Sequence, residues 1–167
     1  MSSLAFLYRI LFVSSLSLFS AAFAQGTKDF DQGKHITGII KGTLIFAGPT
    51  TKDVDNIVLL DGKLRSIVVS ESKFKAEELY KIGTDKQDVY KAYQSWLKPL
   101  EGSDKFMINC EPKARLKNGQ KMVVNFWVDN KKVFSTDTIL IKYKTPLIIM
   151  GPSWRGGKIL MAVELER

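Results

Sequence analysis

The sequence predicts an α+β fold that is rich in β-structure, in which antiparallel β-sheet is covered by one or two helices. Three features of the 167 residues lead to this prediction. Residues 105–166 contain strand-like runs separated by turn signals, residues 34–70 contain shorter runs of the same kind, and residues 72–99 are predicted to be largely helical. A helix with one apolar face needs a surface to cover, and a sheet provides it.

The first 24 residues have the layout of a cleaved secretory signal peptide. Arg9 precedes an apolar and serine-rich run from Ile10 to Phe23, and Ala22-Phe23-Ala24 forms a small-x-small cleavage site. The run is shorter than the roughly 20 apolar residues that span a bilayer, which favours cleavage over an uncleaved anchor. No later run has the length of a membrane span. We therefore expect a periplasmic or extracellular protein with a single domain over residues 25–167.

The amino-terminal part of this domain is expected to consist of a leader and short strands. Residues 25–33 are polar and predict a loose leader. Residues 34–47 alternate as in a strand. Residues 57–60 and 64–69 are rich in β-forming residues, and the intervening Asp61-Gly62 pair predicts a hairpin.

The periodicity then changes. Within residues 72–99, Thr84-Asp85-Lys86-Gln87 matches a capping box and Pro99 marks the end of the expected helix. The apolar stripe of this helix would be Val89, Tyr93, Trp96, Leu97 and Leu100. Such a stripe usually covers a sheet, and a face that fills a partner's groove is the alternative.

The carboxy-terminal sheet is predicted from alternating side chains. Phe106, Ile108 and Cys110 share one face of its first strand, and Asn118-Gly119 predicts a tight turn into residues 122–129. A second turn fits Asp129-Asn130-Lys131, and the final strand carries a regular apolar stripe from Ile159 to Leu165. Between them, Phe134 is out of phase with Ile139, which predicts a bulge near Asp137.

Composition narrows the function classes. Removal of the first 24 residues would take away only Arg9, so the net charge of +8 becomes +7, which favours acidic partners. Cys110 is the sole cysteine, so the chain has no internal disulfide, and Cys110 is either a buried strand residue or half of an intermolecular bridge.

The residues for most catalytic sites are missing. His35 is the sole histidine and no nucleophile turn accompanies it, and one histidine with one cysteine cannot form a Cys/His zinc site. No nucleotide loop is present. We expect no catalytic residue, cofactor or metal and hence no enzyme, although paired carboxylates leave a hydrolase as a remote alternative. The pairs are Asp53 with Asp55, Glu77 with Glu78, and Glu164 with Glu166.

Two groups of residues are candidates for binding a protein partner. The first is a basic region around the predicted Asn118-Gly119 turn, with Lys131 and Lys132 on the next turn, and either solvated turns or an acidic partner would explain it. The basic region comprises Lys113, Arg115, Lys117 and Lys121. The second group is Trp154-Arg155, which lies between Gly-Pro and Gly-Gly and either anchors an interface or packs on the core. Nucleic acid is not expected, because the basic residues are not interleaved with aromatic ones.

The central part of the chain contains a series of short motifs. They are Asp88-Val89-Tyr90-Lys91-Ala92-Tyr93, Trp96, Ile108-Asn109-Cys110-Glu111-Pro112-Lys113-Ala114-Arg115, Val128-Asp129 and Val133-Phe134. Through these motifs, about residues 83–143 resemble the curli assembly accessory protein family, CsgE. The family's carboxy-terminal helical segment has no counterpart here, and the strands of residues 34–69 are additional.

The resemblance implies a periplasmic, non-enzymatic accessory factor that acts as a chaperone in secretion. Its partners would be an outer-membrane secretion channel, an amyloid-fibre subunit, or both. Apart from the resemblance, the sequence leaves a homo-oligomer open. A secreted β-rich binding module, such as an inhibitor or immunity protein, is the alternative hypothesis.

Overall fold

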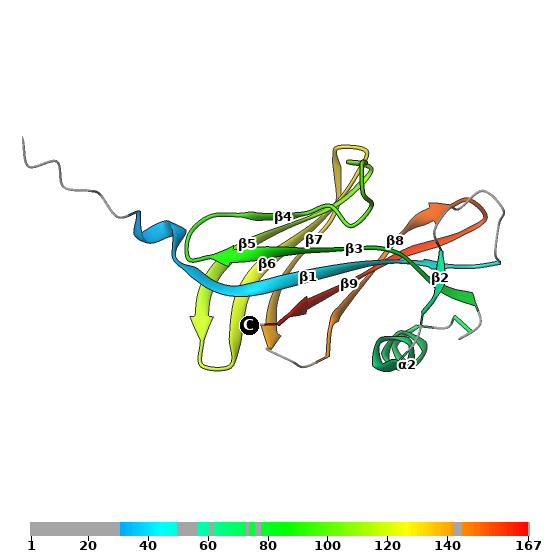
Figure 1. Cartoon of the computed structure of the whole chain (residues 1–167), viewed down its shortest axis with the longest axis horizontal. Helices are drawn as coiled ribbons and strands as arrows, with labels where there is room; N and C mark the ends of the chain where they lie inside the picture. Colours follow the sequence, from blue (N-terminus) through cyan, green and yellow to red (C-terminus); the bar gives the residue numbers. More distant parts are fainter. Residues whose placement is uncertain are drawn as a thin grey trace, which may run out of the picture. The chain divides into compact units, whose positions relative to one another are not determined.

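The computed structural model describes residues 31–49, 57–60, 62–72, 74–75, 78–141 and 145–166. The predicted signal peptide and most of the leader lie outside the described residues, as do Asp53, Asp55 and Glu77. Residues Gln32–Arg167 form one compact unit, in which strands dominate and α2 is the α-helix (Figure 1). The fold class is therefore α+β and β-rich, as the sequence predicts.

Among the described residues, the unit contains one 3-10 helix, one α-helix and nine strands. They are η1 (Gln32–Lys34), β1 (Ile36–Ala47), β2 (Val58–Leu59), α2 (Gly62–Glu71), β3 (Leu79–Tyr90), β4 (Ser95–Leu97), β5 (Phe106–Leu116), β6 (Gly119–Val128), β7 (Lys131–Ile141), β8 (Leu147–Trp154) and β9 (Gly157–Leu165).

The strands form two antiparallel sheets. The larger has the order β2-β3-β1-β9-β8, and the smaller has the order β4-β5-β6-β7. β8 and β9 thus join β1, so the prediction of one carboxy-terminal sheet over residues 105–166 is wrong. Pro146 lies in the link where the chain passes from one sheet to the other. Alternation revealed β5, β6, β7 and β9 as strands but carried no information about which strands are neighbours.

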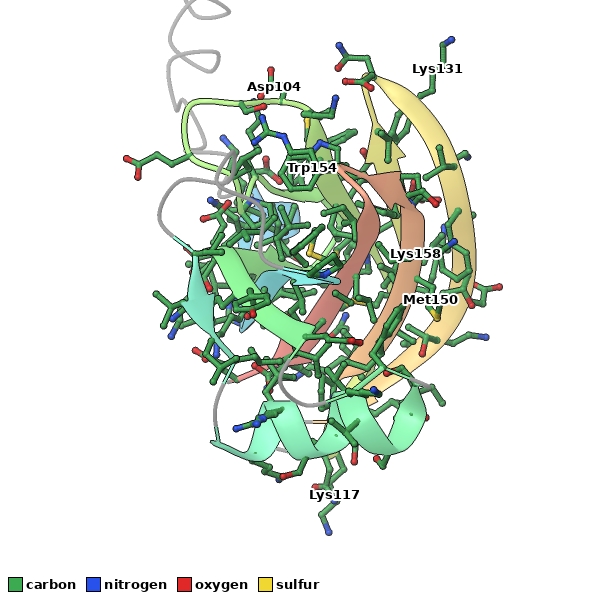
Figure 2. All side chains as sticks on the ribbon, turned by 90° about the vertical axis from the view of Figure 1, so that its right-hand side faces the viewer. Asp104, Lys117, Lys131, Met150, Trp154 and Lys158 are labelled. Atoms are coloured by element: carbon green, nitrogen blue, oxygen red, sulfur yellow. The ribbon has the colours of Figure 1, made fainter. Side chains whose placement is uncertain are left out.

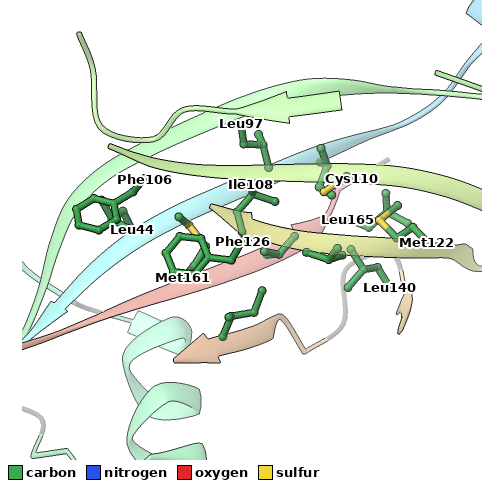
Figure 3. Close-up of a cluster of buried hydrophobic side chains, with 14 of the residues drawn as sticks. Leu44, Leu97, Phe106, Ile108, Cys110, Met122, Phe126, Leu140, Met161 and Leu165 are labelled. Atoms are coloured by element: carbon green, nitrogen blue, oxygen red, sulfur yellow. The ribbon is translucent and has the colours of Figure 1, made fainter. Parts of the chain in front are cut away.

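The main hydrophobic core lies between the two sheets. β1 contributes Leu44 and Phe46, while β5 and β6 contribute Ile108 and Phe126, all fully buried (Figure 3). The stripe predicted for the last strand faces this core too, and it consists of Ile159, Met161, Val163 and Leu165. Two sheets packed face to face in this way bury one side of nearly every strand.

A second core forms on the other face of the larger sheet, beneath α2. Ile45 on β1 and Leu160 on β9 pack there with Val68 of the helix. Residues 64–69 were expected to form a strand of a hairpin, and this prediction is wrong. The four-residue spacing of Leu64 and Val68 places both on one side of a helix, and burial against the sheet outweighs the strand preference of β-branched residues.

The predicted helix within residues 72–99 is also wrong, because most of this segment is strand. β3 pairs with β1 along its whole length, from Ala47 opposite Leu79 to Ile36 opposite Tyr90. The Asp85 carboxylate accepts hydrogen bonds from the backbone N–H groups of Lys86 at 2.7 Å and Lys98 at 2.8 Å. It therefore ties the middle of β3 to the segment directly after β4 and does not cap a helix.

Both predicted turns of the smaller sheet are present, the first one residue earlier than the predicted Asn118-Gly119, but the bulge lies elsewhere. β5 and β6 meet at Lys117-Asn118, and Asp129 and Asn130 adopt φ values of 48° and 61° between β6 and β7. The pairing of β6 with β7 shifts at Val133, since Phe126 faces Phe134 while Trp127 faces Lys132. The bulge is therefore four residues before the predicted Asp137, and it accounts for the phase of Phe134.

Candidate functional site

The predicted basic region lies on the β5–β6 hairpin, but its residues do not share one surface. Lys113 occupies a register shift in β5, Arg115 pairs with Gln120, and Lys121 pairs with Ala114 on the opposite face. Lys117 lies in the turn itself. The hairpin thus brings Lys113 and Arg115 together, whereas Lys121 points away from them.

Lys131 and Lys132 are not part of this region. They lie at the other end of β6, which is ten residues long, so about 30 Å of strand separates the two turns. Figure 2 labels Lys117 and Lys131 at opposite margins of the unit. A continuous basic surface across both turns is therefore not formed.

Lys113 and Arg115 line a pocket of about 370 Å³ together with residues of the larger sheet. We call it the basic pocket; its lining residues are His35, Thr37, Lys91, Lys113, Ala114, Arg115 and Gln120. The first three come from the start of β1 and the segment after β3, where the backbone N–H of Lys91 donates to the His35 carbonyl oxygen at 2.8 Å. The pocket therefore lies where β1 begins, beside the β5–β6 hairpin.

The electrostatics of the basic pocket are positive. The Lys113 ammonium lies 3.4 Å from a Glu111 carboxylate oxygen, in an exposed pair of the kind that contributes little energy. For Lys91 and Arg115 the described residues provide no ion pair within 4.0 Å. Lys91 and Arg115 therefore leave uncompensated positive charge in the lining, and the pocket can attract and hold an anion.

Trp154 and Arg155 lie far from the basic pocket. The Trp154 ring packs edge-on against Phe46 and Phe106, with centroids 5.9 and 5.8 Å apart, so it extends the core. Arg155 places its guanidinium carbon 4.7 Å from the Trp154 ring centroid. Thr37 in the basic pocket and Phe46 beneath Trp154 are nine residues apart along β1, about 30 Å. The two predicted binding groups are thus separate features, and Trp154 is a packing residue.

A polar chain on the outer face of the smaller sheet was not predicted. Asn109 donates to Gln94, Asn125 donates to Asn109, and Ser135 donates to Asn125, over 3.0, 3.0 and 2.7 Å. Beside this chain, the Trp96 and Trp127 rings lie 5.6 Å apart. In the sequence, each of three successive strands has a polar residue on its outer face: Asn109, Asn125 and Ser135. That these residues are neighbours can be recognised only when the strand register is known.

β7 forms the edge of the smaller sheet. One side of this strand pairs with β6, and no described strand pairs with the other. Figure 2 shows β7, in yellow, curving along the margin of the ribbon. Its large exposed apolar residues are Val133, Phe134 and Ile139.

Cys110 is a core residue. It is 1% exposed between the two sheets, and burial raises the pKa of its thiol far above the ordinary value. The described residues contain no group of three or more His, Cys, Asp or Glu side chains that could hold a metal ion. Within the same residues, every helix is too short or too polar to cross a membrane.

The comparisons with known proteins return no relatives. The chain matches no protein-family model, no curated protein sequence and no solved structure.

Proposed function

We propose that the protein is a non-enzymatic, exported accessory factor that binds a protein partner during the secretion or assembly of extracellular fibres, as the resemblance to the CsgE family implies. The observation that supports this proposal most is the open edge of β7. An edge strand presents backbone N–H and C=O groups that an extended polypeptide can pair with, and a fibre subunit in transit is such a polypeptide.

β7 suits this role better than the other edges. It has eleven residues and regular pairing from Phe134 to Ile141, whereas β2 and β4 have two and three residues. β8 has a register shift between Met150 and Ser153 and contains Pro152, which cannot donate to a ladder. Proteins usually protect a long edge, so the exposed side chains of β7 favour a partner there.

The chemistry of binding follows from the geometry. Alternate residues of an antiparallel edge strand direct both backbone groups outward, so a second strand gains hydrogen bonds that do not depend on its sequence. Val133 and Ile139 are each more than half exposed and would supply apolar contacts. A factor with these properties can hold many extended segments without recognising one sequence.

Ile139→Lys tests the proposal, because a lysine on an edge strand opposes pairing with a second strand while the exposed position tolerates the change. Val58→Lys is the matched control, since Val58 is equally exposed and lies on the two-residue edge strand β2. We expect Ile139→Lys, introduced in the native host, to lower the yield of surface fibres, and Val58→Lys to leave it unchanged. Equal yields in both strains would remove the proposal.

Crosslinking from β7 separates the alternatives. Recovery of an outer-membrane channel or a fibre subunit supports an accessory factor, whereas a soluble hydrolase favours an inhibitor or immunity protein. A product containing two copies of this chain, with a dimer by light scattering, would assign the edge to self-association.

A further inference from the structure

The basic pocket contains an amide as well as its cations. Gln120 is 4% exposed as a residue and lines the pocket. Among the described residues, the buried side-chain atom without a hydrogen-bonding partner is Trp127 Nε1, so the Gln120 amide is not sealed off in the core, and it can meet water or a ligand in the pocket. Its position opposite Arg115 in the β5–β6 ladder places the amide beside a guanidinium.

We propose that the basic pocket binds a carboxylate carried by a polypeptide. This inference deepens the proposed function, because it names the chemistry by which the partner is recognised at a second place, distinct from β7. Lys91, directly after β3, and Arg115 on β5 line the pocket from two different segments and would both contact the carboxylate, and His35 would add a further donor.

The charges select the anion. Lys91 and Arg115 have no ion-pair partner among the described residues, so a carboxylate entering the pocket gains two charge-assisted interactions without breaking an existing one. Arg115 can hold both carboxylate oxygens in the bidentate geometry that guanidinium favours. Lys113 is partly neutralised by Glu111 and contributes less.

Gln120 favours a peptide over inorganic phosphate. Its amide offers one acceptor and two donors. A polypeptide supplies both kinds of group within one residue, since its carboxylate accepts and its N–H donates to the glutamine oxygen. A phosphate dianion has a single hydroxyl donor, and it is far smaller than the pocket. The volume of about 370 Å³ accommodates a single residue together with its backbone.

The test uses the purified protein and four probes at about 0.15 M salt, where distant charges are screened. The probes are an acetylated hexapeptide with a free terminal carboxylate, the same peptide amidated, an amidated peptide with one internal glutamate, and inorganic phosphate. Binding is followed by the NMR signals of the Gln120 side-chain amide. We expect the free-carboxylate peptide to shift these signals and the fully amidated peptide to leave them unchanged.

The remaining probes identify the source of the carboxylate. A shift with the internal glutamate assigns an acidic side chain, and its absence assigns the chain terminus; both support the inference. Phosphate that shifts the signals as strongly as the peptide overturns it, and so does the absence of any shift with the carboxylate peptides.

Matched variants distinguish binding in the pocket from general electrostatic attraction of the peptide to a basic protein. Arg115→Gln and Lys91→Gln each remove one charge from a different sheet, and each should weaken peptide binding about tenfold. Lys117→Gln removes the same charge from the exposed turn outside the pocket and should change affinity less than twofold. Equal weakening by all three, with folding verified by thermal melts, overturns the inference.

The outcome is independent of the test of β7. Ile139→Lys should leave peptide binding in the pocket unchanged. Loss of pocket binding together with intact dependence of fibres on Ile139 would remove this inference alone, and the reverse pattern would remove the proposed function alone.

Discussion

Asn125 donates its side-chain amide to the Asn109 side-chain oxygen over 3.0 Å, and both residues are buried although they point away from the core between the sheets. Each has further partners, since Asn109 donates to Gln94 and Asn125 accepts from Ser135. These amides tie three strands and the β3–β4 link together on one face.

Asn125→Ala should lower the free energy of unfolding by about 2 kcal/mol, because it leaves the buried Asn109 oxygen without its donor. Ser135→Ala is the milder companion, since Ser135 is exposed and water can replace its hydroxyl; its cost should be less than about 1 kcal/mol. Urea denaturation measures both values. An equal loss of unfolding free energy in the two variants would show that burial does not determine how much each of these hydrogen bonds contributes to stability.

Cys110 should be inert to thiol reagents in the folded protein. Its thiol is buried and its pKa is raised by burial, so little reactive thiolate forms at neutral pH. Alkylation monitored by mass spectrometry should be slow in native buffer and fast in denaturant. Rapid modification of the folded protein would contradict the burial of this residue.

The same thiol makes stability depend on alkaline pH. The thiol of the unfolded chain titrates near pH 8.5, whereas the folded chain keeps its proton, so stability is fully present below about pH 8.5 and falls as the pH rises above it. Denaturant midpoints of wild type and Cys110→Ala at pH 7 and at pH 9.5 measure this effect, because other titrating groups are common to both. A difference between the two proteins that does not change with pH would refute it.

Gly83→Ala should destabilise the protein by about 3 kcal/mol or more, because a Cβ atom at this position of β3 would overlap the Pro99 carbonyl group. Gly156→Ala is the matched control: Gly156 has a φ of 79° and open space around it, so its cost of about 1–2 kcal/mol comes from the backbone alone. Calorimetric thermal unfolding, which gives both the midpoint and the unfolding enthalpy, measures the loss of unfolding free energy in each variant. A smaller loss for Gly83→Ala than for Gly156→Ala would contradict the close approach.

Trp154→Ala should cost about 3 kcal/mol, since the ring packs against Phe46 and Phe106. Arg155→Ala should cost less than about 1 kcal/mol, because an exposed cation over an aromatic ring contributes little. Chemical denaturation of both variants decides whether this pair stabilises the fold. A Trp154→Ala protein as stable as wild type would return Trp154 to the candidates for partner binding.

Much of the sheet structure could be predicted from the sequence. The shared face of Phe106, Ile108 and Cys110 identified β5, and the turn predicted at Asn118-Gly119 located the β5–β6 hairpin to within one residue of its actual turn, Lys117-Asn118. These features are local, so they can be read along the chain. The pairing of β9 with β1 depends on contacts between distant segments, which no local pattern records.

The two errors in helix placement have one physical cause. Val89 and Leu97 are both buried, but they reach the core from different strands and not from one helix face. Conversely, Val68 lies in a segment with strand-forming composition and becomes helical because the outer face of the larger sheet must be covered. In both cases tertiary burial outweighed local preference.

The basic pocket was predicted in part. Lys113 and Arg115 were identified from charge next to a turn, whereas His35, Lys91 and Gln120 were not, because they reach the pocket from other segments. Gln120 had no distinguishing pattern in the sequence. Only its burial opposite Arg115 gives it significance.

The position of β1 between β3 and β9 also governs how the chain acquires its fold. Lys41 and Glu164 are neighbours across the larger sheet and are separated by 123 residues of sequence. Closing so long a loop is slow, and topologies dominated by distant pairings fold over milliseconds to seconds. A ribosome-bound fragment that ends before β9 therefore lacks the strand that pairs with one side of β1. The larger sheet can be completed only after the last strand has been synthesised, so its closure comes at the very end of translation or after it.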